Sequence, residues 1–349
     1  MIPLGPIRRA VVKSAVGAAR FRLTGHRAPL AVTLVLTHRC DSSCAACGVP
    51  LNPRAELDTS ELLALVDHLA VLGTARVNLT GGEPLSRPDV GAIVDRCAEH
   101  GMWTVLDTNG HQLPARIAEL RRVDRLMVGL HGPQAVHDRV TEPGGFAKAV
   151  AGIAAAREAG LRVDTVTQVG KHTLATLDWV LTDAEAHGSR AVFQLVQASG
   201  ALASKAARRQ LGDNDELRRA WRWLLEARLA GRPVGVSEKV LRYLCTWPDY
   251  SVPTSVLPHE DLHCMAGQVS CVVESDGGVH SCLPRAGAPA ARNLRDDGFD
   301  VAFASLRDEA CQSCADTPCA EANFLYNLNT PVVLDVARAG VRTIFGGAP

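Results

Sequence analysis

The 349-residue sequence has no long apolar run, few aromatic side chains and no excess of either charge. No stretch of about 18 apolar residues occurs, so no membrane-spanning helix is predicted. Aromatic residues make up 4% of the chain, too few for a base-stacking surface, and Lys plus Arg equals Asp plus Glu at 37 each. Arginines interrupt the N-terminal apolar positions, unlike in a secretion signal. We therefore expect a cytoplasmic protein without a nucleic-acid partner.

Cysteine, in contrast, is abundant, with eleven residues in the chain. Disulfides are rare in a reducing cytoplasm, so metal ligation explains this number better. Two cysteines, Cys97 and Cys245, stand alone and are expected to act as small apolar residues. The other nine form two groups, one of Cys40, Cys44 and Cys47 and one of Cys264, Cys271, Cys282, Cys311, Cys314 and Cys319.

Short β-branched runs alternate with amphipathic stretches, which predicts β/α units on a parallel sheet. One such stretch, 59–73, is predicted to be a helix capped by Thr59 or Ser60. Periodicity alone does not separate an open doubly wound sheet from a partial barrel. In both, polar motifs at the carboxyl ends of the strands share one site. The expected strands are 31–37, 76–80, 103–108, 125–130, 162–169 and 191–197.

The chain divides by composition into five segments. They are a basic amphipathic helix (1–28), the β/α region (29–200), a helical connector with a Pro-rich loop (201–262), a cysteine-rich domain (263–329) and a tail (330–349). Because the fourth has little periodicity, we expect metal instead of an apolar core to hold it together.

The first cysteine group has the spacing CX3CX2C, on a loop directly after the first expected strand. Three thiolates leave one metal position open, whereas a structural zinc site uses four ligands. A zinc site completed by His38 is the alternative. Together with the sequence GGEP at 81–84, the loop resembles the radical S-adenosylmethionine superfamily. The resemblance implies an α/β fold, a partial (β/α)6 barrel, with a 4Fe-4S cluster on Cys40, Cys44 and Cys47.

The resemblance also implies that S-adenosylmethionine chelates the remaining iron of this cluster. Relatives usually carry an aromatic residue where this chain has Ala46, so the adenine contacts are not assigned. For His131, a hydrogen-bonded turn histidine before Pro133 is the alternative. The implied cofactor-binding residues are Gly81, Gly82, Glu83, Pro84, Asn109 and His131.

The second cysteine group has the spacing CX12GX4C followed by CX2CX4C. Gly277 and Gly278 predict a tight turn that brings the flanking thiols together. The residues alone fit either a zinc ribbon or an iron-sulfur site. The pattern resembles the auxiliary-cluster extension called SPASM, or its shorter form twitch, which implies one auxiliary 4Fe-4S cluster. The matching ligands are Cys264, Cys282, Cys311 and Cys314, with Cys319 as a further candidate and Cys271 left over.

By resemblance, a flavodoxin- or ferredoxin-type donor reduces the first cluster, and S-adenosylmethionine yields a 5'-deoxyadenosyl radical that takes hydrogen from an unactivated carbon. The auxiliary cluster then accepts the second electron, which makes the enzyme an oxidoreductase. Leu283 replaces the carboxylate of sulfatase-maturing relatives, so that reaction is disfavoured. No residue is singled out as the catalytic base, although Glu274, Asp276, Gln194 and Arg285 lie near the expected site loops.

The expected substrate is a small molecule in natural-product biosynthesis, because only about 30 residues precede the first strand and a leader peptide would need a separate carrier. Maturation of a ribosomal peptide and modification of a membrane-derived lipid are the alternatives. A non-catalytic zinc-binding interaction protein is the alternative of another class.

Residues 1–28 contain six Lys and Arg residues and no acid. Their apolar positions form a rough helical stripe. One interpretation is an interfacial helix on anionic lipid, which would make the protein peripheral to the membrane. The other is a helix that docks on the barrel bottom with its basic face in water.

Overall fold

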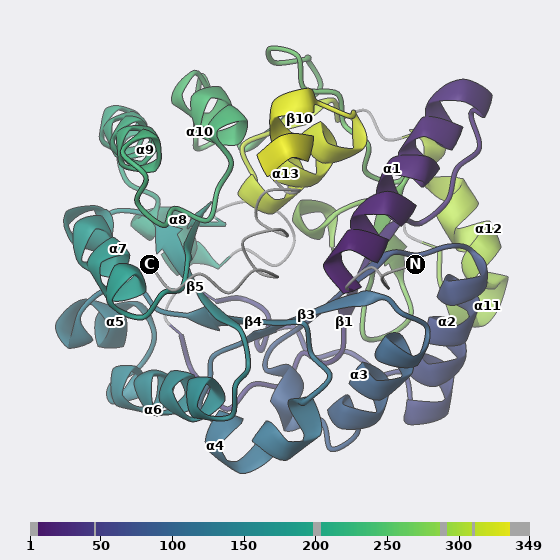
Figure 1. The fold of residues 1–349 in the computed structure, drawn as a ribbon, viewed down its shortest axis with the longest axis horizontal. Helices are drawn as coiled ribbons and strands as arrows, with labels where there is room; N and C mark the ends of the chain where they lie inside the picture. Colours follow the sequence, from purple (N-terminus) through teal and green to yellow (C-terminus); the bar gives the residue numbers. More distant parts are fainter. Residues whose placement is uncertain (1–5, 45–46, 198–203, 287–291, 309–310, 336–349) are drawn as a thin grey trace.

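The computed structural model describes residues 6–44, 47–197, 204–286, 292–308 and 311–335. An eight-stranded sheet with the strand order β6-β5-β4-β3-β2-β1-β8-β9 lies at its centre (Figure 1). The six predicted strands are confirmed, with ends that differ by two residues at most. They are β1 (Ala31–Val35), β2 (Arg76–Thr80), β3 (Trp103–Thr108), β4 (Arg125–Gly129), β5 (Val163–Val169) and β6 (Ala191–Leu195).

Strands β1 to β6 are all parallel and follow one another in chain order. A doubly wound sheet reverses its order at a switch point, whereas this order runs in one direction, as in a barrel. The fold is therefore the partial barrel. The helices between the strands lie outside the curved sheet (Figure 1). They are α2 (Thr59–Val71), α3 (Val90–Glu99), α4 (Leu113–Arg116), α5 (Gln134–Val140), α6 (Gly145–Glu158) and α7 (Leu177–Ala186).

Helix α2 shows how local sequence fixes an element against the sheet. Its N-cap is Asp58, one residue before the expected Thr59. The Asp58 carboxylate accepts from the Glu61 backbone N–H at 2.9 Å, and the Glu61 carboxylate accepts from the Asp58 N–H at 2.7 Å. This capping box satisfies two backbone donors at once. The buried residues of α2 share one core with Val32 and Leu34 of β1.

The C-terminal cysteine-rich segment joins the barrel. Strand β8 (Ser270–Val273) pairs in parallel with β1, and β9 (Val279–His280) pairs antiparallel with β8. The expectation of a segment held by metal instead of a core is therefore wrong, because its apolar residues enter the main core. These residues are Cys271, Val273, Val279, Phe299, Ala302, Phe303 and Leu306.

Short elements complete the C-terminal half. Helices α9 (Asn214–Leu229) and α10 (Glu238–Cys245) pack on each other around Trp221 and Tyr243 in a second core. Strand β7 (Thr254–Ser255) pairs with β10 (Ser313–Cys314). The remaining helices are α8 (Lys205–Gln210), α11 (Leu294–Asp297), α12 (Phe299–Ala304) and α13 (Thr317–Tyr326), and short 3-10 turns lie at Pro84–Ser86, Ile117–Leu120, Leu174–Thr176, Leu283–Arg285 and Ser305–Asp308.

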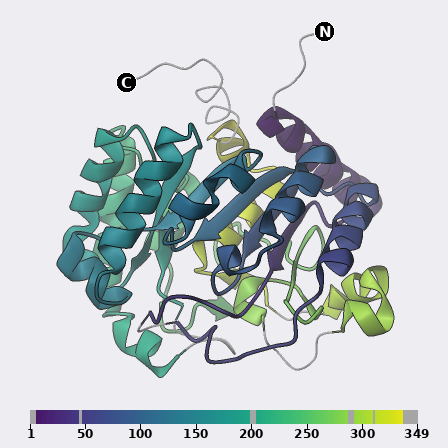
Figure 2. The ribbon, with the colours of Figure 1, turned by 90° about the horizontal axis from the view of Figure 1, so that it is seen from below.

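Helix α1 (Pro6–Thr24) docks on the barrel. Its Ala10 packs with Ala75 and Trp103 near the starts of β2 and β3, and its Ala18 packs with Tyr326 of α13. In Figure 2, α1 lies on the opposite side of the molecule from the coil that follows β1. None of the helices in the described part of the chain has the length and hydropathy that a bilayer crossing requires.

The contact between α6 and the end of β3 leads to a stability prediction. A Cβ on Gly152 would overlap the carbonyl group of Gly110. Gly152→Ala should therefore lower the free energy of unfolding by about 1–3 kcal/mol, although alanine favours helices. Urea denaturation measures this change. The exposed Ala154→Gly variant in the same helix serves as the control and should cost about 1 kcal/mol or less. A stabilised Gly152→Ala protein would contradict the packing.

Candidate metal and cofactor site

The cysteine loop follows β1, and its first residues are hydrogen-bonded to the loop after β2. The backbone N–H groups of Gly82 and Glu83 donate to the carbonyl oxygens of Thr37 at 2.7 Å and Arg39 at 2.8 Å. A Cβ on Gly81 or Gly82 would overlap one of these two carbonyl oxygens. The two glycines are therefore required for the loops to touch, which is a reason beyond the expected approach to a cofactor.

Glu83 is fully buried and joins the ends of β2 and β3. One carboxylate oxygen accepts from the backbone N–H of Leu85 and the hydroxyl of Thr108, both at 2.9 Å. The other accepts from the backbone N–H of Asn109 at 2.8 Å. Burial raises the pKa of Glu83 to about 7, against the lowering effect of these hydrogen bonds. Glu83 thus fixes the segment 83–85 relative to β3, while Pro84 opens a short 3-10 turn.

Two carboxylates connect the cysteine loop to neighbouring segments: Asp41, which lies on the loop, and Glu142, which lies between α5 and α6. Asp41 accepts from the side-chain amides of Asn109 at 2.7 Å and Gln112 at 2.9 Å. Glu142 accepts from the backbone N–H of Ser43 at 2.9 Å and from its hydroxyl at 3.1 Å. The bond from the Ser43 backbone is the main cause that lowers the pKa of Glu142 to about 2, and Lys148 adds to it. Asn109 therefore contacts the loop itself, and its contact with the cofactor remains a prediction.

The three thiols of this loop are partly buried. Burial raises the pKa of all three, that of Cys40 to about 12. Such thiols ionise when a cation stabilises the thiolate, so a bound metal suits this donor set. As they stand in the described residues, no three His, Cys, Asp or Glu side chains are arranged to hold a metal ion. The ligand role of Cys40, Cys44 and Cys47 therefore stays a prediction.

His131 is enclosed at the end of β4. Its Nδ1 accepts from the backbone N–H of Gln168 at 3.3 Å, and its own backbone N–H donates to His137 Nδ1 at 3.3 Å. The two rings stack with their centroids 5.4 Å apart. Burial lowers the pKa of His131 to about 3, so the ring is neutral at physiological pH. These contacts fit the hydrogen-bonded turn histidine, and cofactor binding by His131 remains a prediction.

Five C-terminal thiols come together although they lie on separate elements. Burial raises the pKa of Cys264 to about 12, and the charges of Cys314, Cys311 and Cys282 raise it further. Interaction with Cys282 and Cys314 raises the pKa of Cys319, and interaction with Cys319 lowers that of Cys282. These interactions place the five thiols near one another, but no three of them are arranged as metal ligands in the described residues, so the auxiliary ligand set stays a prediction.

The local folds explain this convergence. Pairing of β10 with β7 places Cys314, whose carbonyl oxygen accepts from the Tyr243 hydroxyl at 3.0 Å. Cys319 lies in the first turn of α13, where its backbone N–H donates to the capping carboxylate of Asp316 at 2.9 Å. Cys271, in contrast, is buried in β8 within the main core. The expectation that Cys97 is a core residue is confirmed as well, while Cys245 is only partly buried.

Comparison with known proteins matches residues 34–182 to the family described as the Radical SAM superfamily. The match includes the cysteine loop and the GGEP sequence, so residues 34–182 are similar to the core of radical SAM enzymes. Enzymes of this class use S-adenosylmethionine and a 4Fe-4S cluster, and the SPASM-type maturases among them carry auxiliary clusters, while the type of the C-terminal cysteine segment of this chain stays a prediction.

The chain is 34% identical over 171 residues to the PqqA peptide cyclase of Ruegeria pomeroyi, a match that covers 47% of the chain but only 46% of that relative. It is 29% identical to the mycofactocin maturase MftC of Mycobacterium ulcerans, covering 83% of the chain and 81% of MftC. Streptococcus suis SuiB bound to S-adenosylmethionine has a TM-score of 0.63 at 13% identity, covering 84% of this chain and 71% of SuiB, which shows a shared fold.

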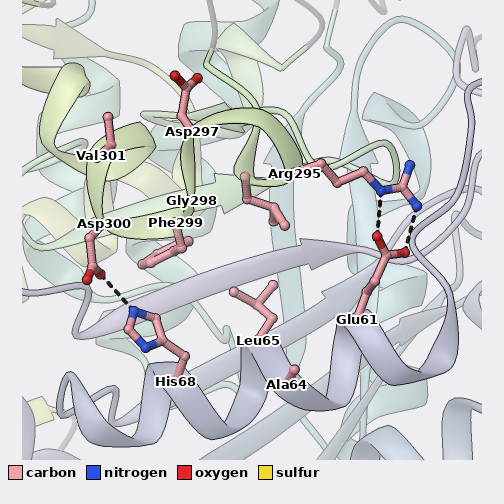
Figure 3. A pocket seen from close by; sticks show the side chains of 11 residues that line it. Glu61, Ala64, Leu65, His68, Arg295, Asp297, Gly298, Phe299, Asp300 and Val301 are labelled. Carbon is pink, nitrogen blue, oxygen red and sulfur yellow. Dashed lines mark hydrogen bonds and ion pairs between the residues drawn. The ribbon is translucent and has the colours of Figure 1, made fainter.

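A surface groove of about 680 Å³ lies away from both cysteine groups, between α2 and the helices α11 and α12 (Figure 3). Leu65 and Phe299 line it. The ion pair Glu61–Arg295 at 2.6 Å and the pair His68–Asp300 at 2.7 Å cross it. None of the expected site residues lines this groove, so we read it as the seam between the barrel and the C-terminal segment.

The stacked histidines predict a pH dependence of stability. Burial lowers the pKa of His137 to about 4, whereas an unfolded histidine titrates near 6.5. The unfolded chain therefore binds the proton first, so stability is complete above pH 6.5 and falls as the pH drops towards 4. His137→Asn removes this effect and keeps an acceptor for the His131 N–H. Urea denaturation at pH 7.5 and at pH 5.5 measures how much unfolding free energy is lost between these two values. This loss should be smaller in the variant than in the wild type by on the order of 1 kcal/mol. Equal losses would contradict the assignment.

The auxiliary thiols predict a difference in iron content. Cys282→Ala removes a ligand candidate from the five converging thiols, so anaerobically reconstituted protein should lose about four irons per chain. Cys271→Ala changes only a core thiol and should keep all of its iron. Iron and sulfide assays measure both variants. Loss of iron from Cys271→Ala, or retention in Cys282→Ala, would mean that the ligands are assigned wrongly.

Proposed function

We propose that this radical SAM protein is a peptide-modifying maturase. The observation that carries the proposal is the match to MftC, which extends over 83% of the chain and therefore beyond the barrel into the cysteine-rich segment. Two further similar proteins also act on or bind peptides by their names: the PqqA peptide cyclase, and SuiB, whose structure has also been solved with its precursor peptide SuiA. A peptide substrate is thus better supported than the small molecule expected from the sequence.

The residues of the first site fit the cofactors of the class. Three thiols on one loop leave an iron free, and the loops around them are fixed by Glu83, Asp41 and Glu142. When bound, the cluster and S-adenosylmethionine supply an organic radical that removes hydrogen from an unactivated carbon. The chain contributes preorganisation, because hydrogen bonds to these three carboxylates fix the loops around the site before a cofactor binds.

The auxiliary thiols support an oxidative outcome. A cluster on Cys264, Cys282, Cys311, Cys314 or Cys319 would give the substrate's second electron a path out of the site, so we propose a net two-electron oxidation. A flavodoxin- or ferredoxin-type protein is the proposed donor.

The peptide proposal is tested with short precursor peptides encoded beside the gene. Anaerobic, reduced protein with S-adenosylmethionine should form 5'-deoxyadenosine faster when its peptide is added, and the peptide should lose about 2 Da by mass spectrometry. The Cys44→Ala variant is the control and should do neither. Peptides that leave the rate of 5'-deoxyadenosine formation unchanged, while an aminocyclitol raises it, would favour the small-molecule alternative.

We also propose that α1 contacts anionic lipid while docked on the barrel. Its outward face exposes Val12, Val16 and Leu23 by 50%, 63% and 85%, beside the exposed cations Lys13 and Arg20. Apolar side chains flanked by cations favour an interfacial position on an anionic membrane.

This proposal predicts flotation with vesicles. Full-length protein should float with phosphatidylglycerol-rich vesicles at low salt, and the variant Val16→Glu should float several-fold less, because a buried carboxylate near anionic lipid is costly. Val71→Glu is the matched control, since Val71 is 84% exposed on a different helix, α2. Equal flotation of wild type and Val16→Glu would reject the lipid contact.

A further inference from the structure

A buried histidine–carboxylate pair connects the two cysteine-bearing regions. His38 lies two residues before Cys40, and Glu274 follows β8 directly. His38 Nε2 is 2.9 Å from a Glu274 carboxylate oxygen, and the exposed fractions of the two side chains are 2% and 0%. The two residues are 236 positions apart in sequence. Three other histidine–carboxylate pairs of the described residues are partly or largely exposed to solvent; they are His68–Asp300, His100–Asp67 and His187–Asp183.

His38 also closes the cysteine loop on itself. Its Nδ1 is 2.5 Å from the carbonyl oxygen of Asn52, which lies beyond the last cysteine of the loop. A carbonyl oxygen only accepts, so Nδ1 carries the proton. The Asn52 side-chain amide donates to the carbonyl oxygen of Gly48 at 2.6 Å, one residue after Cys47. The ring of His38 therefore ties the start of the loop to its end, and Glu274 orients that ring.

The tip of the β8–β9 hairpin holds the same loop at two more points. The Ser275 carbonyl oxygen accepts from the Leu57 N–H at 2.6 Å. The Asp276 carboxylate pairs with Arg54 at 2.6 Å. Both partners lie on the segment that leads from the cysteine loop into α2. Three successive residues of the hairpin, 274–276, thus contact the loop and its exit.

The energetic cost of burying the Glu274 carboxylate indicates that this residue has a role other than filling the core. Its second oxygen, Oε1, has no hydrogen-bond partner among the described residues. A buried carboxylate with an unpaired oxygen is destabilising compared with an apolar side chain of the same size. The core position alone would therefore favour leucine. Burial lowers the pKa of His38, but the hydrogen bonds to Glu274 and Asn52 outweigh this effect and leave its pKa raised.

We propose that Glu274 and His38 form a clasp through which the hairpin of the auxiliary segment positions the cysteine loop for S-adenosylmethionine. The hairpin ends at His280, two residues before Cys282, so its position depends on the auxiliary thiols. Loading of the auxiliary site and cofactor affinity at the first site are thereby coupled. Glu274 is a positioning residue that acts through His38. The proposal depends on the superfamily's cofactor site and not on the peptide substrate.

The test measures the binding of S-adenosylmethionine, without turnover, to anaerobically reconstituted protein with its clusters oxidised. Glu274→Leu should weaken binding about tenfold or more, because residues that orient a metal-site loop typically contribute 10–100-fold. It should also change the EPR spectrum of the reduced first cluster in the presence of the cofactor. Glu274→Gln keeps an acceptor for His38 and should recover most of the affinity. Iron content is measured in each variant, so that only protein with a full first cluster is compared.

A matched control and a milder variant complete this test. Asp300→Leu removes the carboxylate of the solvent-exposed His68 pair and should leave the affinity unchanged. If Glu274→Leu does not fold, Arg54→Met loosens the hairpin tip at a half-buried pair and should weaken binding less but in the same direction. Unchanged affinity and EPR spectra in Glu274→Leu or, in its place, Arg54→Met would overturn the clasp.

The coupling is tested by a double-mutant cycle. Cys282→Ala should weaken S-adenosylmethionine binding in the wild-type background and have a much smaller effect when Glu274 is leucine, because the connection is already broken. Additive effects of the two substitutions would overturn the coupling. This experiment involves no peptide, so failure of the peptide proposal and failure of the clasp are distinguishable.

Discussion

The structure depends on the use of both edges of β1. On one side β1 pairs with β2, and on the other with β8, and both partners are parallel to it. The loop that leaves β1 therefore emerges between two strands instead of at a free edge. The β2 side contributes the glycines that meet Thr37 and Arg39, and the β8 side contributes Glu274. Parallel strands end at the same edge of a sheet, so this pairing alone brings segments more than 200 residues apart to one site.

Around this loop, the same kind of interaction recurs. Carboxylates from three elements each accept hydrogen bonds that fix a particular backbone or side-chain atom of the loop or its neighbour. Asp41 is bound by amides, Glu142 by Ser43 and Lys148, and Glu83 by backbone N–H groups. Neutral donors make most of these hydrogen bonds, and Lys148 is the one cation among the partners of the three carboxylates in the described part of the chain.

Much of this could be predicted from the sequence, where the signal is local. Period-2 and period-3.6 patterns predict the six strands and α2, and the turn at Gly277 predicts the hairpin that leads to Cys282. The pairing of β8 with β1 could not be predicted, because the sequence pattern of a four-residue strand does not indicate which strand it pairs with. Its consequence, that Cys271 is a core residue, was hidden for the same reason. The clasp and Glu142 were missed because a contact across 99 or 236 residues leaves no motif.

Helix α1 has a consequence for the order of events during turnover. Its Ala10 packs with Ala75 and Trp103 near the starts of β2 and β3, so the helix covers this part of the lower end of the barrel. The proposed substrate and S-adenosylmethionine would then share the opening at the carboxyl ends of the strands, where the cysteine loop lies. With the proposed peptide substrate, entry and exit through one opening would be sequential: the peptide would cover the bound cofactor, and the cofactor would leave only after the peptide.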